Sequence, residues 1–259
     1  MRILKLQQGI IYGPIHSRRL GLSLGLNLLP TRHKLCSFNC VYCHYGWTKI
    51  LTTNPSDSYQ DFPTPEEFGI ALKKALVDGG AFDYITFSGN GEPTLHPQFP
   101  EIVTIAKELK ERYAPKARLA ILSNSTVLKQ ENIRRALDKL EVKILKLDAG
   151  DVHTFRTINR PAEGVNFDDI IKTLKGMQDI ILQTVFVDGT SSNVRPEQLM
   201  LWMERVGEIR PREAQIYSID RPPADHSLKK VSLSTLEEIA RETEKTTGVK
   251  VNVFGTSSR

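Results

Sequence analysis

The sequence predicts an α/β fold with parallel strands, and three observations support this class. Short runs rich in β-branched and apolar residues recur along the 259-residue chain, amphipathic segments lie between them, and no linker rich in Pro, Gly or Ser interrupts the series. The alternation repeats about six times, which fits a doubly wound open sheet or a full or partial β/α barrel. We expect a single domain over residues 1–259, a length that is ample for a buried core.

The expected strands are rich in Val, Ile and Leu, and several of them are almost continuously apolar. This pattern is typical of parallel strands that are buried on both faces. The runs cover residues 22–28, 82–87, 118–122, 142–147, 180–187, 214–219 and 249–254.

The expected helices combine start signals with apolar residues at helical spacing. Thr64-Pro65-Glu66-Glu67 is a capping box with proline in the first turn, and Gly79-Gly80 is expected to end that helix. Ser234-Thr235-Leu236-Glu237 is expected to open the last helix in the same way. Further helices are expected over 131–140, over 167–177 and along two apolar stripes: Ile102, Ile105, Ala106 and Leu109, and Leu199, Trp202 and Val206.

Composition excludes several classes of protein. With 40% hydrophobic and 25% charged residues, the chain is neither collagen-like nor disordered. Its net charge of +5 is compatible with a nucleic-acid or anionic substrate without selecting one. It contains no apolar run of the roughly 18 residues that a membrane span needs, and its N-terminus does not resemble a signal peptide.

All three cysteines lie in the long segment 33–63, between the first expected strand and the first expected helix. Cys36, Cys40 and Cys43 form a poor disulfide framework and a good metal site, which favours the reducing cytoplasm. Three thiolates on one loop can hold an iron–sulfur cluster and leave one iron open. The alternatives are free buried cysteines, a zinc site with His44 as fourth ligand, and a C-x-x-C-H haem attachment that leaves Cys36 unused.

The spacing C-x3-C-x-aromatic-C, with Tyr42 at the aromatic position, resembles the motif of the radical S-adenosylmethionine (SAM) superfamily. The resemblance implies a partial (β/α)6-type TIM barrel with the motif after the first strand. It implies that Cys36, Cys40 and Cys43 hold a [4Fe–4S] cluster whose open iron binds SAM, with the region of Tyr42 beside the adenine. In that family the reduced cluster cleaves SAM to methionine and a 5′-deoxyadenosyl radical.

A glycine-rich segment, Ser88-Gly89-Asn90-Gly91-Glu92-Pro93, follows the strand expected at 82–87. Such a segment is either a simple turn or a place where a ligand approaches the backbone closely. It resembles the GGEP motif of the family, with Asn90 in place of the first glycine. The resemblance implies that Gly89, Asn90, Gly91 and Glu92 hold the methionine moiety of SAM.

Polar residues also follow the next two expected strands. Ser123, Asn124 and Ser125 follow the strand at 118–122, and Lys146 and Asp148 end the strand at 142–147. In a parallel barrel, such strand ends gather at one face and carry binding groups. The resemblance implies that Ser123, Asn124, Lys146 and Asp148 bind the SAM carboxylate or ribose. The alternatives are helix capping or turn formation for Ser123, Asn124 and Ser125, and a solvated strand-edge charge for Lys146.

Several residues are candidates for the substrate side. Gln183 is a polar residue within an apolar strand, so it either points into the barrel toward the substrate or pairs with a neighbouring buried group. Arginine suits the planar binding of phosphate or carboxylate, although surface solvation is equally expected. Loop arginines near the strand ends are Arg18, Arg19, Arg156, Arg160 and Arg221, and loop histidines without an assigned role are His153 and His226.

Most of the chain resembles the radical SAM subgroup that includes the tRNA-wyosine synthases. The resemblance extends over Tyr12-Gly13-Pro14, Ser17-Arg18-Arg19-Leu20-Gly21, the cysteine loop, residues 88–95 and Asp148-Ala149. Those enzymes carry further cysteines for a second cluster, whereas this chain has only three cysteines, so it resembles a minimal radical SAM core. Wyosine synthesis itself is therefore not expected.

We expect a cytoplasmic radical SAM enzyme that removes a hydrogen atom from an unidentified substrate. The resemblance and the net charge favour RNA or a nucleotide as the substrate. The resemblance also implies a reductant such as flavodoxin or ferredoxin. Two alternatives remain open: activation of a protein partner by formation of a glycyl radical, and a non-enzymatic iron–sulfur or zinc module. The sequence does not identify a catalytic protein residue.

Overall fold

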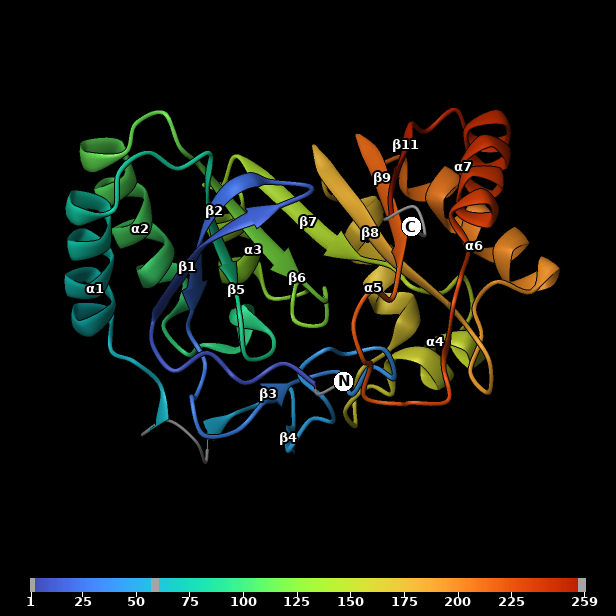
Figure 1. The fold of residues 1–259 in the computed structure, drawn as a ribbon, viewed down its shortest axis with the longest axis horizontal. Coiled ribbons are helices and arrows are strands. Elements are labelled where there is room, and N and C mark those ends of the chain that lie inside the picture. The colour runs from blue at the N-terminus through green and yellow to red at the C-terminus, as the bar shows by residue number, and fades with distance from the viewer. Residues whose placement is uncertain (1–2, 57–60, 256–259) are drawn as a thin grey trace. The chain divides into compact units, whose positions relative to one another are not determined.

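The computed structural model of the protein describes residues 3–56 and 61–255, and these residues form two compact units. The N-terminal unit comprises Leu6–Ser37 and Thr48–Ile144, and the C-terminal unit comprises residues 3–5, 38–47 and 145–255. Figure 1 shows that both units are built from strands and helices. The expectation of one domain over residues 1–259 stays a prediction.

The N-terminal unit contains a mostly parallel set of strands. β2 (Gly21–Asn27) pairs in parallel with β5 (Tyr84–Ser88), and β5 pairs in parallel with β6 (Arg118–Ser123). Glu141 N donates to Leu119 O at 3.0 Å, directly before β7 (Val142–Lys146), which carries the chain into the other unit. β1 (Ile11–Ser17) pairs antiparallel to β2 and was not predicted, because its largely exposed side chains form no apolar run.

Helices cover one face of these strands. α1 (Pro65–Asp78) and α2 (Phe99–Tyr113) lie side by side in Figure 1, and α3 (Glu131–Leu137) contacts α2. The predicted capping box is confirmed, since Thr64 Oγ1 accepts from Glu67 N at 3.2 Å and Glu67 Oε2 accepts from Thr64 N at 2.8 Å. α3 ends three residues earlier than predicted, because residues 137–140 close into i→i+3 turns.

The cysteine segment begins in this unit as a small parallel pair of strands. β3 (Leu35–Cys36) pairs with β4 (Ile50–Leu51), and a short 3-10 helix, η2 (Pro93–Leu95), packs nearby. A cluster of buried apolar side chains anchors β3: Leu29, Leu35, Phe62, Leu95 and Val127. Residues 57–60 of the predicted loop lie outside the described residues.

The C-terminal unit also has parallel strands. β8 (Ile180–Asp188) pairs with β9 (Glu213–Ser218), and β9 pairs with β11 (Val251–Phe254). A two-residue strand, β10 (Lys229–Lys230), pairs antiparallel to β8. Leu147 N, just after β7, donates to Gln183 O of β8 at 3.1 Å. The seven predicted strands are therefore all present, with small differences in their bounds.

Four helices belong to the C-terminal unit: α4 (Val152–Asn159), α5 (Phe167–Lys175), α6 (Pro196–Ile209) and α7 (Leu233–Thr247). α5 ends two residues before the predicted bound. The N-cap of α7 is Ser232, whose Oγ accepts from Thr235 N at 3.1 Å, so the prediction of a cap at Ser234 was wrong. The backbone is already helical at Ser234, and a capping residue must have extended backbone, as Ser232 has.

α4 was not predicted, and its presence corrects the location of three side chains. Its cap is Asp151, whose Oδ1 accepts from Thr154 N at 2.9 Å. His153 and Arg156 therefore lie in a helix rather than a loop, and Arg160 is the C-cap with a left-handed backbone (φ 43°). Over the part of the chain that the structure describes, we find no helix with the length and apolarity of a membrane span.

Candidate functional site

The three cysteines lie on one loop that runs from one unit to the other, and none of them forms a disulfide. Cys36 is buried in the N-terminal unit, and Cys40 and Cys43 belong to the C-terminal unit, where Cys40 is buried and Cys43 half-buried. Among residues 3–56 and 61–255, no three His, Cys, Asp or Glu side chains are arranged to hold a single metal ion.

In the N-terminal unit, Cys36 faces the amide of Asn124. Asn124 Nδ2 lies 3.6 Å from Cys36 Sγ and donates to Ser37 Oγ at 2.9 Å, while Asn124 Oδ1 accepts from Thr126 N at 3.2 Å. Asn124 thus shapes the turn after β6 and directs an N–H group at the thiol. It does not cap α3, whose N-cap is Gln130, so the capping alternative for this residue was wrong.

Glu92 connects the glycine-rich loop with the end of β6. Its side chain is only 2% exposed. Glu92 Oε1 accepts from Ser123 Oγ at 2.8 Å, and Oε2 accepts from Asn124 N at 2.6 Å. Thr94 adds two donors to Oε1, its N at 3.2 Å and its Oγ1 at 2.5 Å. Burial raises the pKa of Glu92, although these four hydrogen bonds oppose the shift.

Asn90 is fully buried, and its side-chain amide forms hydrogen bonds with backbone groups. Oδ1 accepts from Gln7 N at 2.8 Å, and Nδ2 donates to the carbonyls of Gln7 and Pro30 at 2.9 and 3.0 Å. Asn27 Oδ1 accepts from Asn90 N at 3.0 Å. The residue that departs from the family's GGEP motif therefore fixes the loop to the chain before and after β2.

Gly91 allows this loop to contact the backbone of Leu35, the residue before Cys36 in the sequence. Its φ is +151°, and a Cβ at this position would lie 1.7 Å from Leu35 O. Leu35 N donates to Asn90 O at 3.2 Å, and Glu92 N donates to Leu35 O at 3.3 Å. Only glycine fits here, because any side chain would occupy the space of the Leu35 carbonyl.

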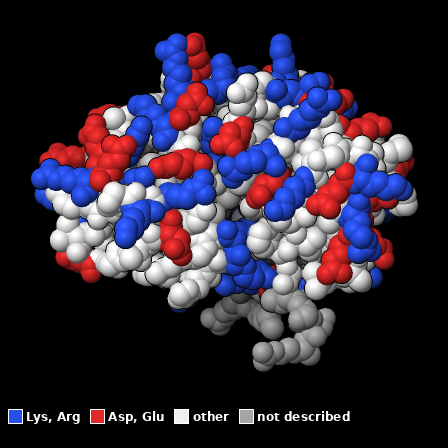
Figure 2. Space-filling model, turned by 90° about the horizontal axis from the view of Figure 1, so that it is seen from above, with Lys and Arg blue, Asp and Glu red and all other residues white. Residues whose placement is uncertain are grey.

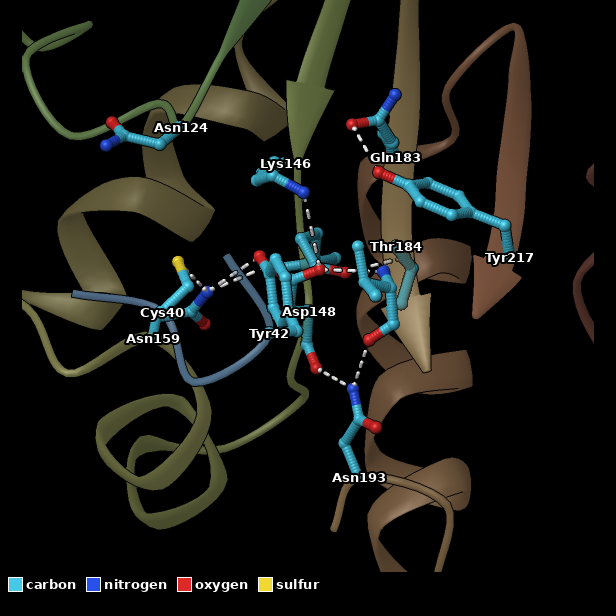
Figure 3. A network of polar contacts seen from close by, with 12 residues as sticks. Cys40, Tyr42, Asn124, Lys146, Asp148, Asn159, Gln183, Thr184, Asn193 and Tyr217 are labelled. Atoms are coloured by element: carbon cyan, nitrogen blue, oxygen red, sulfur yellow. Dashed lines mark hydrogen bonds and ion pairs between the residues drawn. The ribbon is translucent and has the colours of Figure 1, made fainter. Parts of the chain in front are cut away.

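The C-terminal unit brings together Cys40, Tyr42, Asp148 and Asn159, which come from the loop, the end of β7 and the end of α4 (Figure 3). The Tyr42 hydroxyl donates to Asp148 Oδ2. Asn159 Nδ2 donates to Asp148 Oδ2 at 2.7 Å and also lies 3.5 Å from Cys40 Sγ. Asn159 thus connects the Cys40 thiol to the buried carboxylate of Asp148. Its amide N–H is directed at Cys40 Sγ, as that of Asn124 is at Cys36 Sγ.

Both the side chain and the backbone carbonyl of Asp148 accept hydrogen bonds from β8 and the segment that follows it. Its Oδ1 accepts from Val185 N of β8 at 2.8 Å, and its backbone carbonyl accepts from Asn193 Nδ2 at 2.9 Å. Lys146 Nζ lies 3.9 Å from Asp148 Oδ1 and 4.9 Å from the centroid of the Tyr42 ring. The Lys146 side chain is 20% exposed, so the alternative of a solvated strand-edge charge was wrong.

The backbone of the cysteine loop is attached to the end of α4. Asn39 N donates to Asn159 O at 2.9 Å, and Val41 N donates to Ile158 O at 3.0 Å. These bonds give Cys40 a fixed position relative to Asn159. Sequence reasoning missed Asn159 and Asn193, because no motif marks either residue and α4 was not predicted.

Burial dominates the ionisation of this group. It raises the pKa of the Cys40 thiol to about 11, and the negative charge of Asp148 acts in the same direction. Burial, followed by the same carboxylate, raises the pKa of Tyr42 well above its usual value. Within each unit, an amide N–H is directed at a cysteine sulfur, at Cys36 from Asn124 and at Cys40 from Asn159. Soft thiol ligands with such donors suit iron–sulfur chemistry.

Comparison with known proteins identifies the family. Residues 32–193 match the model of the Radical SAM superfamily, which is more than half of the chain. The chain belongs to the radical SAM superfamily. It is therefore an enzyme of this class, and its cofactors are a [4Fe–4S] cluster and SAM.

Relatives of this radical SAM enzyme extend over most of its length. A protein of Brachyspira hyodysenteriae named GTPase Obg is 27% identical over 98% of this chain, but the chain spans only 36% of that protein. A UPF0026 protein of Methanocaldococcus jannaschii is 28% identical over 89% of this chain and 70% of its own length.

Solved structures show the fold. SuiB of Streptococcus suis, bound to its precursor peptide SuiA, has a TM-score of 0.64 at 16% identity and covers 89% of this chain; the chain spans 48% of SuiB. TYW1 with a lysine–pyruvate adduct has a TM-score of 0.56 at 14% identity, over 88% of this chain and 74% of that protein. The predicted α/β fold of the partial TIM-barrel type is confirmed.

The substrate-side candidates of the radical SAM enzyme lie in different surroundings. Arg18 and Arg19 lie in the turn between β1 and β2, and Arg221 is exposed after β9. Arg160 lies over the ring of Trp47, with its Cζ 4.8 Å from the centroid. Gln183 is buried in β8, and its Oε1 accepts from the Tyr217 hydroxyl at 3.3 Å (Figure 3).

Proposed function

We propose that Cys36, Cys40 and Cys43 hold the [4Fe–4S] cluster and that the enzyme removes a hydrogen atom from an RNA base or nucleotide. The observation that carries the ligand assignment is the pair of asparagine amides. Asn124 directs an N–H at Cys36 Sγ from 3.6 Å, and Asn159 directs one at Cys40 Sγ from 3.5 Å. Donors of this kind stabilise thiolate ligands and orient them around a metal centre.

When bound, the cluster would supply the electron and SAM the 5′-deoxyadenosyl group for the radical chemistry, with methionine as the other product. The protein residues bind and position. We propose that the loop Gly89–Glu92 and the β6 end at Ser123 and Asn124 hold the methionine part of SAM. Glu92 and Asn90 would act largely by fixing the position of this loop, because their side-chain atoms are already hydrogen-bonded to other protein groups.

In the C-terminal unit, we propose that Lys146 and Asp148 bind the carboxylate or ribose of SAM and that the Tyr42 region borders the adenine. The ammonium group of Lys146 supplies positive charge, with Asp148 Oδ1 3.9 Å away and the Tyr42 ring 4.9 Å away. Burial of Tyr42 and Asp148 keeps water away from this region, which protects a radical from side reactions.

A nucleotide substrate is supported by the net charge of +5 and by the motif resemblance to the subgroup that includes the tRNA-wyosine synthases. On the face shown in Figure 2, Lys and Arg side chains are interspersed with Asp and Glu side chains. Recognition would therefore depend on individual side chains more than on a uniform basic surface. A cytoplasmic location and a flavodoxin or ferredoxin as reductant are part of the same proposal.

The test is anaerobic reconstitution with iron and sulfide, followed by measurement of 5′-deoxyadenosine after addition of SAM and dithionite. We expect about four irons per chain in the wild type. Cys36→Ala, Cys40→Ala and Cys43→Ala should each lose the cluster absorbance and the product. Asn54→Ala is the matched control, because Asn54 is exposed in the same loop.

Two results would overturn the proposal. If a cysteine variant retained the iron content and SAM cleavage of the wild type, that ligand would be assigned wrongly. If cellular RNA and nucleotides left the product level unchanged, while a partner protein acquired a glycyl radical, the substrate class would be wrong. Binding of tRNA that weakens steeply with added salt would support the nucleic-acid assignment.

A further inference from the structure

Two glutamines lie next to each other on neighbouring strands of the C-terminal unit. Gln183 of β8 and Gln215 of β9 are register partners, so their side chains project from the same face of the sheet. Their side chains are 3% and 4% exposed. Glutamine is rarely buried to this extent unless its amide is fully hydrogen-bonded.

Each amide has one hydrogen-bond partner among the described residues, and for Gln215 that partner fixes the orientation of the amide. Gln215 Nε2 donates to Glu213 Oε1 at 3.0 Å, and a carboxylate can only accept from an ordinary amide, so Gln215 Oε1 must point away. Gln183 Oε1 accepts from the Tyr217 hydroxyl at 3.3 Å. The other two atoms, Gln183 Nε2 and Gln215 Oε1, are buried and have no hydrogen-bond partner among the described residues.

The pair faces away from the helix-covered core and lies near the group around Asp148. Thr184, the next residue along β8, points to α6, where its Oγ1 accepts from Trp202 Nε1 at 3.1 Å, so Gln183 points to the opposite face. Leu147, between Lys146 and Asp148, donates its N–H to Gln183 O at 3.1 Å. A donor and an acceptor without partners therefore lie one strand from the residues assigned to SAM.

We propose that Gln183 and Gln215 together bind a cis amide edge, the lactam edge of a nucleobase. Gln183 Nε2 would donate to the ring carbonyl, and Gln215 Oε1 would accept from the adjacent ring N–H. Neighbouring strands are about 4.8 Å apart, which suits two side chains that contact adjacent atoms of one ring. The inference rests on the proposed nucleotide function and names the part of the substrate that is recognised.

The arrangement disfavours an ordinary peptide bond. The carbonyl and N–H of a trans peptide point in opposite directions, so two side chains on one sheet face do not reach both. A lactam or a primary carboxamide presents them side by side. Both free atoms are closed to solvent, so binding requires the surrounding side chains to move, including the half-buried Tyr217.

The test measures binding of uridine to the reconstituted, SAM-loaded enzyme by anaerobic equilibrium dialysis. Uridine carries a lactam edge, and 3-methyluridine lacks the N–H. We expect the wild type to bind uridine roughly tenfold more tightly than 3-methyluridine, and the double variant Gln183→Met, Gln215→Met to lose that preference. Gln178→Met is the control, because Gln178 is exposed just before β8.

Thermal unfolding shows whether the double variant is folded. Methionine removes the two buried atoms that have no partner, and the two hydrogen bonds that are lost with them go to the half-buried residues Glu213 and Tyr217. We therefore expect the unfolding temperature of the double variant to equal or exceed that of the wild type. A core role for the pair predicts this stabilisation without any loss of uridine binding. A recognition role predicts the stabilisation together with the loss.

Three results would overturn the inference. Equal affinity of the wild type for uridine and 3-methyluridine would exclude lactam recognition. A double variant that binds SAM tenfold more weakly but binds uridine as the wild type does would assign the pair to the adenine of SAM. Specific binding of nicotinamide, but not uridine, would assign it to a carboxamide. Dialysis needs no turnover, so this outcome is independent of whether the enzyme forms 5′-deoxyadenosine.

Discussion

Replacement of Glu92 by glutamine tests whether its carboxylate holds the glycine-rich loop to the end of β6. Four donors converge on the two oxygens, and two of them are the backbone N–H groups of Thr94 and Asn124. A glutamine NH2 group replaces one oxygen in either orientation. The hydroxyl donors can rotate to accept, but one backbone N–H then faces another donor.

An unsatisfied buried N–H costs about 1–3 kcal/mol. At about 2–4 °C per kcal/mol for a chain of this size, Glu92→Gln should lower Tm by about 2–12 °C at neutral pH. The assay is thermal unfolding followed by circular dichroism, with Glu108→Gln as the control, because Glu108 is exposed on α2. A Glu92→Gln protein that unfolds within 1 °C of the wild type would refute the reasoning.

The pH dependence provides a second measurement on the same pair of proteins. Burial raises the pKa of Glu92 in the folded state above its unfolded value, so the folded protein binds a proton more readily. The wild type therefore gains stability as pH falls through the folded pKa toward the ordinary glutamate value of 4.5, and the glutamine variant does not. The difference in Tm should widen over that window, and a difference that narrows would contradict the direction of the shift.

Three further predictions concern the surroundings of the site. Asn159→Leu removes the N–H directed at Cys40 Sγ, so the cluster potential measured by EPR-monitored titration should become more negative; an unchanged potential would argue against this contact. Gly91→Ala should lower Tm and iron loading much more than Gly80→Ala, because both have positive φ but only Gly91 meets backbone within 3 Å; equal losses would contradict this. Burial lowers the pKa of His96 to about 4, so the wild type should lose roughly 3 kcal/mol of stability relative to His96→Asn between pH 6.5 and 4, and parallel pH profiles would contradict the shift.

The local elements follow from the sequence because their causes are local. The capping box at Thr64 depends on a hydrogen bond between residues three apart, and it forms as predicted. The buried strands are visible because both faces of a parallel strand need apolar side chains. The exposed strand β1 gives no such pattern, and the serine-rich start of α7 contains two plausible caps, Ser232 and Ser234, between which only the backbone conformation decides.

By itself, the sequence determined the cofactor chemistry, since three cysteines at a specific spacing and an aromatic residue suffice to indicate the radical SAM class. The tertiary structure decided which side chains contact those cysteines. Asn159 lies 119 residues from Cys40 in sequence, and Gln215 faces Gln183 only because β8 and β9 pair in one register. Such pairings depend on how strands and helices pack, and the free energy of packing is shared among many distant residues that no short motif records.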